Sequence, residues 1–167
     1  MMKYIIALIS IVMVAILVSF VQRRYKGMRY AIQNAKTGKN LRPFAAGKQN
    51  DNRLVQYDHH SWKCMTWDFE EVGFQTYLIK NRYTSKTFQT SGEPWANSRL
   101  FQQELIGGSS QQWELIRQTE DAYRIKLKGT NLFISVSSDK ANSDIVLLPF
   151  QEDDAQLWKL VKQNPLL

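Results

Sequence analysis

One short stretch of the chain gathers side chains that could hold a ligand. Within seven residues it carries amide, carboxylate and imidazole groups and one indole ring: Gln56, Asp58, His59, His60 and Trp62. Amides and carboxylates pair with hydroxyl groups, and an indole face covers apolar C–H surface, so this set suits a polar ligand with one apolar face. An ordinary polar hairpin with one packed aromatic ring is the competing interpretation. Trp95, after Glu93-Pro94, is a second candidate platform, although isolated exposed aromatic rings are common on protein surfaces.

The same stretch raises the question of a metal site or of a catalytic nucleophile. His59, His60 and Cys64 match no zinc spacing, and no further ligand or acid–base pair converges on them in the sequence. Cys64 is the only cysteine, so the chain has no intramolecular disulfide. The paired acids and paired glycines elsewhere are most simply turns: Glu70-Glu71, Asp153-Asp154 and Gly107-Gly108. We therefore expect no enzyme, no bound metal and no cofactor.

The N-terminal part of the chain has the character of a membrane segment. Residues 4–21 form an apolar run in which only Ser10 and Ser19 are plainly polar. A helix of that length extends about 27 Å, close to the hydrocarbon thickness of a bilayer. A cleaved signal has a shorter core, about 7–15 residues, and then small residues, where this chain has Phe20 and Val21. We predict a single-pass anchor in the lipid bilayer, with a cleaved signal of a secreted protein and a buried core helix as the alternatives.

The basic character of the chain is concentrated beside this segment. The formal net charge is +7, but residues 1–29 hold five basic side chains and no acid, which leaves a net charge of +2 for the rest. Such a domain lacks the positive surface that nucleic-acid binding requires, so we expect no nucleic-acid partner. Four of the five bases follow the apolar run, where they can meet anionic headgroups: Arg23, Arg24, Lys26 and Arg29. By the positive-inside rule, this bias favours a cytoplasmic domain.

A threefold repeat is the strongest pattern in the remaining chain. Trp67, Trp113 and Trp158 lie 46 and 45 residues apart. Three further kinds of large side chain precede them in the same order, and an apolar residue follows each tryptophan two positions later. These sets are Tyr30, Tyr77 and Tyr123; Leu41, Phe88 and Ile134; Leu54, Leu100 and Ile145; and Phe69, Leu115 and Leu160. A period of this length indicates three copies of one structural unit.

The repeat also predicts the fold class. Each anchor lies in a short run rich in β-branched and aromatic residues, as strands do, and beyond residues 4–21 no stretch has a helical period over ten residues. Asp153-Asp154-Ala155 could form one short turn before the last strand. Three units are too few for a propeller, and a solenoid would have atypical end repeats. We predict an all-β domain, a β-trefoil over residues 30–167 with repeats at about 30–73, 74–120 and 121–163, preceded by a membrane helix within residues 1–29.

The third anchor of each unit resembles the ricin-B-lectin family, whose repeats end in a Gln-x-Trp motif. Gln111-Gln112-Trp113 and Gln156-Leu157-Trp158 match this motif fully, and Met65-Thr66-Trp67 matches at the tryptophan. The opening of the first unit, residues 30–41, is also similar to the start of such a repeat, as is Leu54-Val55-Gln56. The resemblance extends from Tyr30 to about Lys162 and implies a β-trefoil that binds carbohydrate.

The resemblance also implies which residues would form a galactose-type site. The family places an aspartate after the Leu/Phe/Ile anchor, an aromatic platform in the middle hairpin and an asparagine before the Gln of the motif. Here these three positions hold Arg42, Asp58 and Cys64 in the first unit, Gln89, Glu104 and Ser110 in the second, and Ser135, Pro149 and Ala155 in the third. No unit has the intact set.

Two functions follow from this combination. The first is a membrane-tethered lectin module that binds a glycan through a non-standard or degenerate site, for which Gln56, Asp58, His59, His60, Trp62 and Trp95 are the candidate residues. The second is a structural or protein-interaction subunit that meets a protein partner at the membrane and binds no sugar. The family resemblance favours an extracytoplasmic domain, which conflicts with the charge bias, so the side of the membrane remains open.

Overall fold

Twelve strands of four to eight residues follow one another over residues 29–162. The computed structural model describes residues 29–165, and in this part the strands are β1 (Arg29–Asn34), β2 (Asn40–Pro43), β3 (Leu54–Tyr57), β4 (Thr66–Gly73), β5 (Thr76–Asn81), β6 (Thr87–Thr90), β7 (Leu100–Gln103), β8 (Gln112–Arg117), β9 (Ala122–Leu127), β10 (Leu132–Val136), β11 (Ile145–Pro149) and β12 (Trp158–Lys162). Between residues 29 and 165 no helix is long and apolar enough to cross a membrane. The predicted anchor, residues 4–21, lies outside the described part.

Six of the strands close into a barrel. Antiparallel pairing joins β1 to β4, β4 to β5, β5 to β8, β8 to β9, β9 to β12, and β12 back to β1. The last strand completes the ring because Trp158 pairs with both Asn34 and Tyr123. Closure gives hydrogen-bond partners to the backbone N–H and C=O groups that the edge strands of an open sheet would expose.

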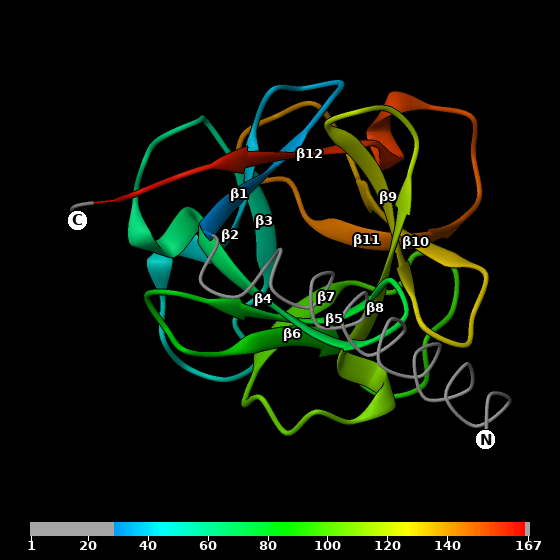
Figure 1. Ribbon diagram of the computed structural model, residues 1–167. Coiled ribbons are helices and arrows are strands. Elements are labelled where there is room, and N and C mark those ends of the chain that lie inside the picture. Colours follow the sequence, from blue (N-terminus) through cyan, green and yellow to red (C-terminus); the bar gives the residue numbers. More distant parts are fainter. Residues whose placement is uncertain (1–28, 166–167) are drawn as a thin grey trace, which may run out of the picture.

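The other six strands form three hairpins, β2–β3, β6–β7 and β10–β11. Single bridges link each hairpin to the next, from Arg53 to Phe101, from Arg99 to Val146 and from Asp144 to Val55. Arg53, Arg99 and Asp144 therefore hold equivalent positions around a pseudo-threefold axis. Figure 1 shows the three units in separate sectors, the first in blue to teal, the second in green and the third in yellow to red. The predicted β-trefoil is confirmed for the described residues.

The repeated apolar anchors fill the interior of this barrel. Trp67, Trp113 and Trp158 are at most 1% exposed, and the aliphatic and phenylalanine anchors are buried around them: Leu41, Phe88, Ile134, Leu54, Leu100 and Ile145. Tyr30, Tyr123 and Leu160 are partly buried against the same cluster. Burial of large side chains at about 25 cal/mol per Å² is the main force that holds such a domain, and no disulfide assists it here.

Two buried asparagines lock neighbouring units together, which the sequence did not lead us to expect. Asn34 pairs with Trp158 and Asn81 with Trp67, while Leu127 pairs with Trp113 at the third equivalent place. The Asn34 amide donates to the carbonyl of Ala155 over 3.0 Å, and the Asn81 amide donates to that of Cys64 over 2.9 Å. Each asparagine thus fastens a turn that precedes a tryptophan.

A short 3-10 turn lies before each tryptophan strand: η2 (Lys63–Met65), η3 (Ser109–Gln111) and η4 (Asp154–Gln156). The third confirms the turn expected at residues 153–155, and Asp153 caps it by accepting from the backbone N–H of Ala155. In the second unit, the Gln111 side chain accepts from the N–H groups of Ile106 and Gly107. Gln156 accepts from Gln151 in the same way. The glutamine of the motif therefore holds the loop that follows the middle hairpin in the second and third units.

Candidate binding site

The loop after β3 carries a cluster of three aromatic rings. His60 stacks on Trp62 with ring centroids 4.1 Å apart and an interplanar angle of 11°. Tyr57, at the end of β3, lies 6.5 Å from Trp62 and 6.3 Å from His60. Trp62 nevertheless remains 36% exposed. The structure therefore brings His60 and Trp62 together at the surface, in the loop between β3 and η2.

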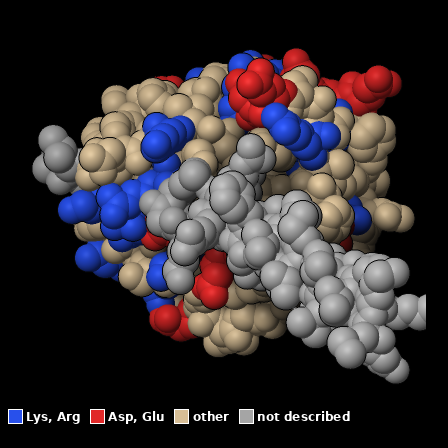
Figure 2. Space-filling model, in the orientation of Figure 1, with Lys and Arg blue, Asp and Glu red and all other residues tan. Residues whose placement is uncertain are grey.

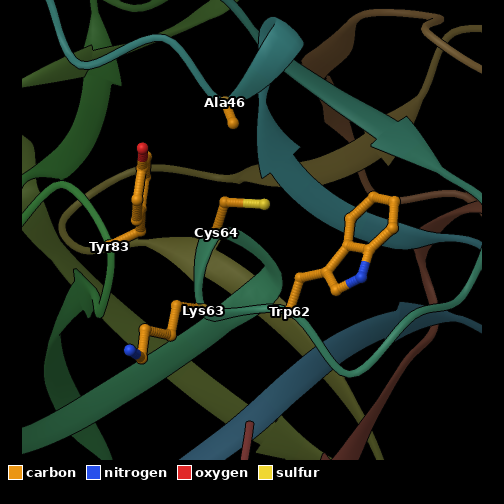
Figure 3. Close-up of a pocket in the computed structure, with 5 residues that line it drawn as sticks. All are labelled: Ala46, Trp62, Lys63, Cys64 and Tyr83. Atoms are coloured by element: carbon orange, nitrogen blue, oxygen red, sulfur yellow. The ribbon is translucent and has the colours of Figure 1, made fainter. Parts of the chain in front are cut away.

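Trp62 borders a pocket of about 240 Å³. Its other lining residues come from three separate segments: Ala46 from the turn η1 (Phe44–Ala46), Lys63 and Cys64 from η2, and Tyr83 from the turn between β5 and β6. Figure 3 shows the Trp62 and Tyr83 rings on opposite sides of the Cys64 thiol, with Lys63 directed away from Ala46. Two aromatic rings that flank a shallow floor can enclose the apolar faces of one small ligand.

The backbone around Trp62 is fixed before any ligand arrives. The Trp62 carbonyl accepts from the N–H of Met65 over 3.0 Å and from the Thr66 hydroxyl over 2.9 Å. The carbonyl of His60 accepts from the Gln163 amide over 3.2 Å. The first unit has these contacts although Met65 occupies the place of the motif glutamine. A site held in this way loses little conformational entropy on binding.

Tyr83 is also held in place, and it was missed in the sequence. Its backbone N–H donates to the Asn81 side chain over 3.0 Å, and the Lys48 ammonium lies 4.3 Å above its ring centroid. Ala46 adopts a left-handed conformation with φ 54°, which is unusual for a residue with a side chain. Neither residue belongs to the hairpin, so the sequence offered no signal that they line the pocket beyond the aromatic character of Tyr83.

Two exposed polar residues of the predicted set, Asp58 and His59, lie in the loop that follows β3. Asp58 is paired with Lys39, with 3.3 Å between the carboxylate and the ammonium. His59 is exposed and its Nδ1 lies 3.1 Å from the amide nitrogen of Asn40. Both side chains retain surface that faces solvent, and neither lines the pocket beside Trp62. They can contact only a ligand that extends beyond that pocket.

Gln56 lies in the interior instead of at the surface. It is fully buried, and its amide donates to the carbonyls of Ser138 and Lys140 and to the Ser143 hydroxyl. Its carbonyl oxygen accepts from the Thr37 hydroxyl over 2.6 Å. Its amide NH₂ group is thus used to fasten the third unit to the first. In this conformation Gln56 supports the hairpin and has no free group for a ligand.

The three family positions of the first unit hold a different constellation from a galactose-type site. Arg42, at the aspartate position, is buried with its guanidinium 3.6 Å from the centroid of the Tyr57 ring. It donates to the Asn142 side chain over 3.2 Å. Cys64, at the asparagine position, is buried, and this burial raises the pKa of its thiol, an effect that the nearby Arg42 charge partly opposes. A neutral thiol is a poor nucleophile and a poor metal ligand at pH 7.

The equivalent positions in the other two units carry no aromatic platform. In the second unit, Gln89 accepts from the motif residue Gln111 over 2.7 Å, and Glu104 is paired with Lys86. In the third unit, Ser135 is buried and Pro149 is exposed. Across residues 29–165 no three His, Cys, Asp or Glu side chains are close enough to hold a metal ion together.

Trp95 belongs to a different hairpin and a different pocket. It is 62% exposed in the loop between β6 and β7 and borders a hollow of about 270 Å³ with Ser91, Asn97, Ser98, Arg99 and Phe101. The structure therefore divides the predicted residues between two places.

On the face seen in Figure 2, basic side chains gather on the left and acidic ones at the top and below the centre, so neither sign covers that face.

Comparison with known proteins identifies the family of the chain. The model of the ricin-type beta-trefoil lectin domain-like family matches residues 19–104 and again residues 63–149. No curated protein sequence matches the chain.

Solved structures show the same fold at low sequence identity. An exo-beta-1,3-galactanase from Clostridium thermocellum has a TM-score of 0.78 and 22% identity, over 81% of this chain and 30% of that chain. The designed threefold-symmetric protein ThreeFoil has a TM-score of 0.76 and 20% identity, over 80% and 97% of the two chains. A ricin B-like lectin from Macrolepiota procera, solved with lactose, has a TM-score of 0.70 and 22% identity, over 81% and 95%. The chain belongs to the ricin-type β-trefoil lectin-like family.

Proposed function

We propose that this protein is a carbohydrate-binding module whose sugar site is the pocket beside Trp62. The observation that carries this proposal is the partly exposed indole of Trp62, held by its stack on His60 at the mouth of a pocket of about 240 Å³. Sugars present a face of C–H groups that packs on aromatic rings, while their hydroxyls need polar partners at the edge. Trp62 and Tyr83 supply the rings, and the Tyr83 hydroxyl supplies a polar group.

Membership of the family supports carbohydrate as the ligand class, and the individual residues narrow the kind of site. The relative from Macrolepiota procera was solved with lactose, and an earthworm R-type lectin was solved with GalNAc. In this chain Arg42 and Cys64 replace the aspartate and asparagine of a galactose-type site. The proposed site therefore relies on ring stacking more than on a carboxylate that grips two hydroxyls, and its ligand need not be galactose.

We also propose that residues 4–21 tether the module to a membrane. Arg29 begins β1, and its carbonyl accepts from the N–H of Gln163 at the end of the barrel where the chain also leaves β12. β1, β5 and β9 run in the same direction from that end of the barrel, and each leads into one of the three hairpins at the other end. An anchor joined at Arg29 would thus hold the hairpin face away from the bilayer. Protease protection of the domain in intact cells or spheroplasts tests the side of the membrane.

The alternative function, a structural or protein-interaction subunit, is favoured by a separate observation. Phe74 is 88% exposed in the turn between β4 and β5, and Ile106 is 79% exposed in the loop after β7. Exposed apolar side chains of this size can serve as contacts for a protein partner. This function predicts that full-length protein purified from membranes carries a stoichiometric partner. Recovery of the protein alone would count against it.

A broad glycan array tests the carbohydrate function directly. The full-length protein is solubilised in detergent and applied to the array beside Trp62→Ala, with Phe74→Ala as a matched loss of an exposed aromatic ring. We expect at least one glycan signal that Trp62→Ala removes and Phe74→Ala retains. An array with no signal for the wild-type protein would refute carbohydrate binding.

A further inference from the structure

A second pocket lies on the hairpin of the second unit, away from the three family positions of that unit. It is bordered by Ser91, Trp95, Asn97, Ser98, Arg99 and Phe101 and has a volume of about 270 Å³. Its residues come from the loop between β6 and β7 and from the start of β7, whereas Gln89, Glu104 and Ser110 lie outside its lining. The two pockets share no residue, so a ligand at one does not occupy the other.

The loop that carries Trp95 is rigid although the ring itself is 62% exposed. The N–H of Trp95 donates to the Ser98 hydroxyl over 3.0 Å, and the N–H of Ser98 donates back to the Trp95 carbonyl over 3.1 Å. The loop is also fastened to β11, because the Asn97 N–H donates to the Leu147 carbonyl and the Leu147 N–H donates to the Ser98 carbonyl. These bonds fix the backbone from which the Trp95 indole projects, so less conformational entropy is lost when a ligand binds there.

Arg99 gives this pocket a positive charge. Its Nε lies 3.1 Å from one carboxylate oxygen of Asp144, and Arg53 contacts the other oxygen over 2.7 Å. Two guanidinium groups thus share one carboxylate at the pseudo-threefold axis, which leaves one positive charge unbalanced. Within residues 29–165 the terminal nitrogens of Arg99 have no hydrogen-bond partner, and the side chain is 62% exposed. Glu93, in the same loop, is exposed and does not line the pocket.

We propose that this second pocket binds an acidic saccharide, with the sugar ring on Trp95 and its anionic group on Arg99. The ion pair with Asp144 fixes the guanidinium and leaves its two terminal nitrogens to donate in parallel, which suits the two oxygens of a carboxylate and also a sulfate. Asn97 and Ser91 offer polar groups for the hydroxyls. The inference rests on the proposed carbohydrate function but uses a different pocket.

Titration calorimetry of the full-length protein in detergent with three matched disaccharides tests this inference. The probes end in glucose, in glucuronate and in glucose 6-sulfate. We expect the acidic probes to bind about tenfold more tightly than the neutral one, since one charge-assisted contact distinguishes them. The preference should weaken as the salt concentration rises. A stronger response to glucuronate identifies a carboxylate ligand, and a stronger response to the sulfate identifies a sulfated one.

Variants separate this site from the pocket beside Trp62. Arg99→Gln should abolish the preference for acidic probes, and Trp95→Ala should weaken the binding of acidic probes. Trp62→Ala should weaken only the neutral binding that the first pocket contributes and should leave the tighter binding of the acidic probes in place. Asp144 keeps Arg53 as a partner in Arg99→Gln, and an unchanged thermal transition verifies the fold. An acidic preference that survives Arg99→Gln, or equal binding of the three probes, would overturn the inference. If the inference fails in this way, binding of the neutral probe that depends on Trp62 would still support the pocket beside Trp62. If the acidic probes are preferred but no neutral binding depends on Trp62, the pocket beside Trp62 is refuted and the pocket beside Trp95 is not.

Discussion

The imidazole of His60 lies parallel to the indole of Trp62, with 4.1 Å between the ring centroids. One face of the indole is therefore covered by the imidazole, and the exposed remainder borders the pocket shared with Tyr83. Stacking of this kind adds about 0.5–1.5 kcal/mol beyond the burial of area. It holds Trp62 in one orientation on a loop that lacks the motif glutamine.

Removal of this stack should weaken sugar binding without removing any group from the pocket. We expect His60→Ala to lower glycan affinity roughly three- to tenfold, because a mobile indole must be ordered on binding. His60→Phe keeps a flat ring and should retain most of the affinity. Titration of an array-positive glycan measures both variants. Equal affinities of His60→Ala and the wild-type protein would show that the stack does not orient the site.

The buried Gln111 should contribute to stability through the loop that it holds. In Gln111→Met, which copies Met65 of the first unit, the N–H groups of Ile106 and Gly107 lose their acceptor. We expect a loss of about 1–3 kcal/mol in the free energy of unfolding. Urea denaturation measures it, with the exposed Gln118→Met as control. A change within about 0.5 kcal/mol, typical of surface positions, would contradict this role.

The buried Asn81 should be a stability determinant of the first two units. Its amide donates to the Cys64 carbonyl, and its oxygen accepts from the N–H groups of Tyr83 and Thr84. Asn81→Ala leaves these groups without partners, so we expect a loss of about 2–4 kcal/mol. The exposed Asn131→Ala should have little effect on the denaturation midpoint. Similar midpoints for the two variants would refute the role of Asn81 as a lock between units.

Burial disfavours the thiolate and raises the pKa of the Cys64 thiol above its ordinary value, an effect that the nearby Arg42 charge partly opposes. At pH 8 the folded protein should therefore react with a thiol reagent more slowly than the urea-unfolded chain. The folded state keeps the thiol proton up to a higher pH than the unfolded state does. The contribution of Cys64 to stability is therefore complete below the pKa of the unfolded state and is lost as the pH rises through the pKa of the folded state. Cys64→Ala, which copies Ala155, should lack this decrease. Faster labelling of the folded form would contradict the shift.

The fold was accessible from the sequence because its core depends on a few large side chains at fixed spacing. Trp67, Trp113 and Trp158 recur with the other anchors, and this spacing is recognisable although the residues between the anchors differ from unit to unit. The asparagine locks were not accessible. Asn34 and Asn81 have no counterpart at Leu127, and two matches among many polar residues do not stand out from chance.

The candidate site was accessible only in part, because side chains from distant segments complete it. Trp62 and His60 are neighbours in the sequence, and their proximity could be foreseen. Gln56 is buried by contacts with residues more than 80 positions away, which no local pattern encodes. Tyr83 lines the same pocket as Trp62 only because the turn between β5 and β6 packs beside the first unit.

Carbohydrate binding beside Trp62 is the central claim, and one titration tests it most directly. A neutral glycan that gives an array signal is titrated into full-length wild-type protein and into the variants Trp62→Ala and Trp95→Ala. Loss of an aromatic platform costs on the order of 1–3 kcal/mol, so Trp62→Ala should bind at least about fivefold more weakly. Trp95→Ala should match the wild-type protein. An affinity of Trp62→Ala within twofold of the wild-type value would contradict the account.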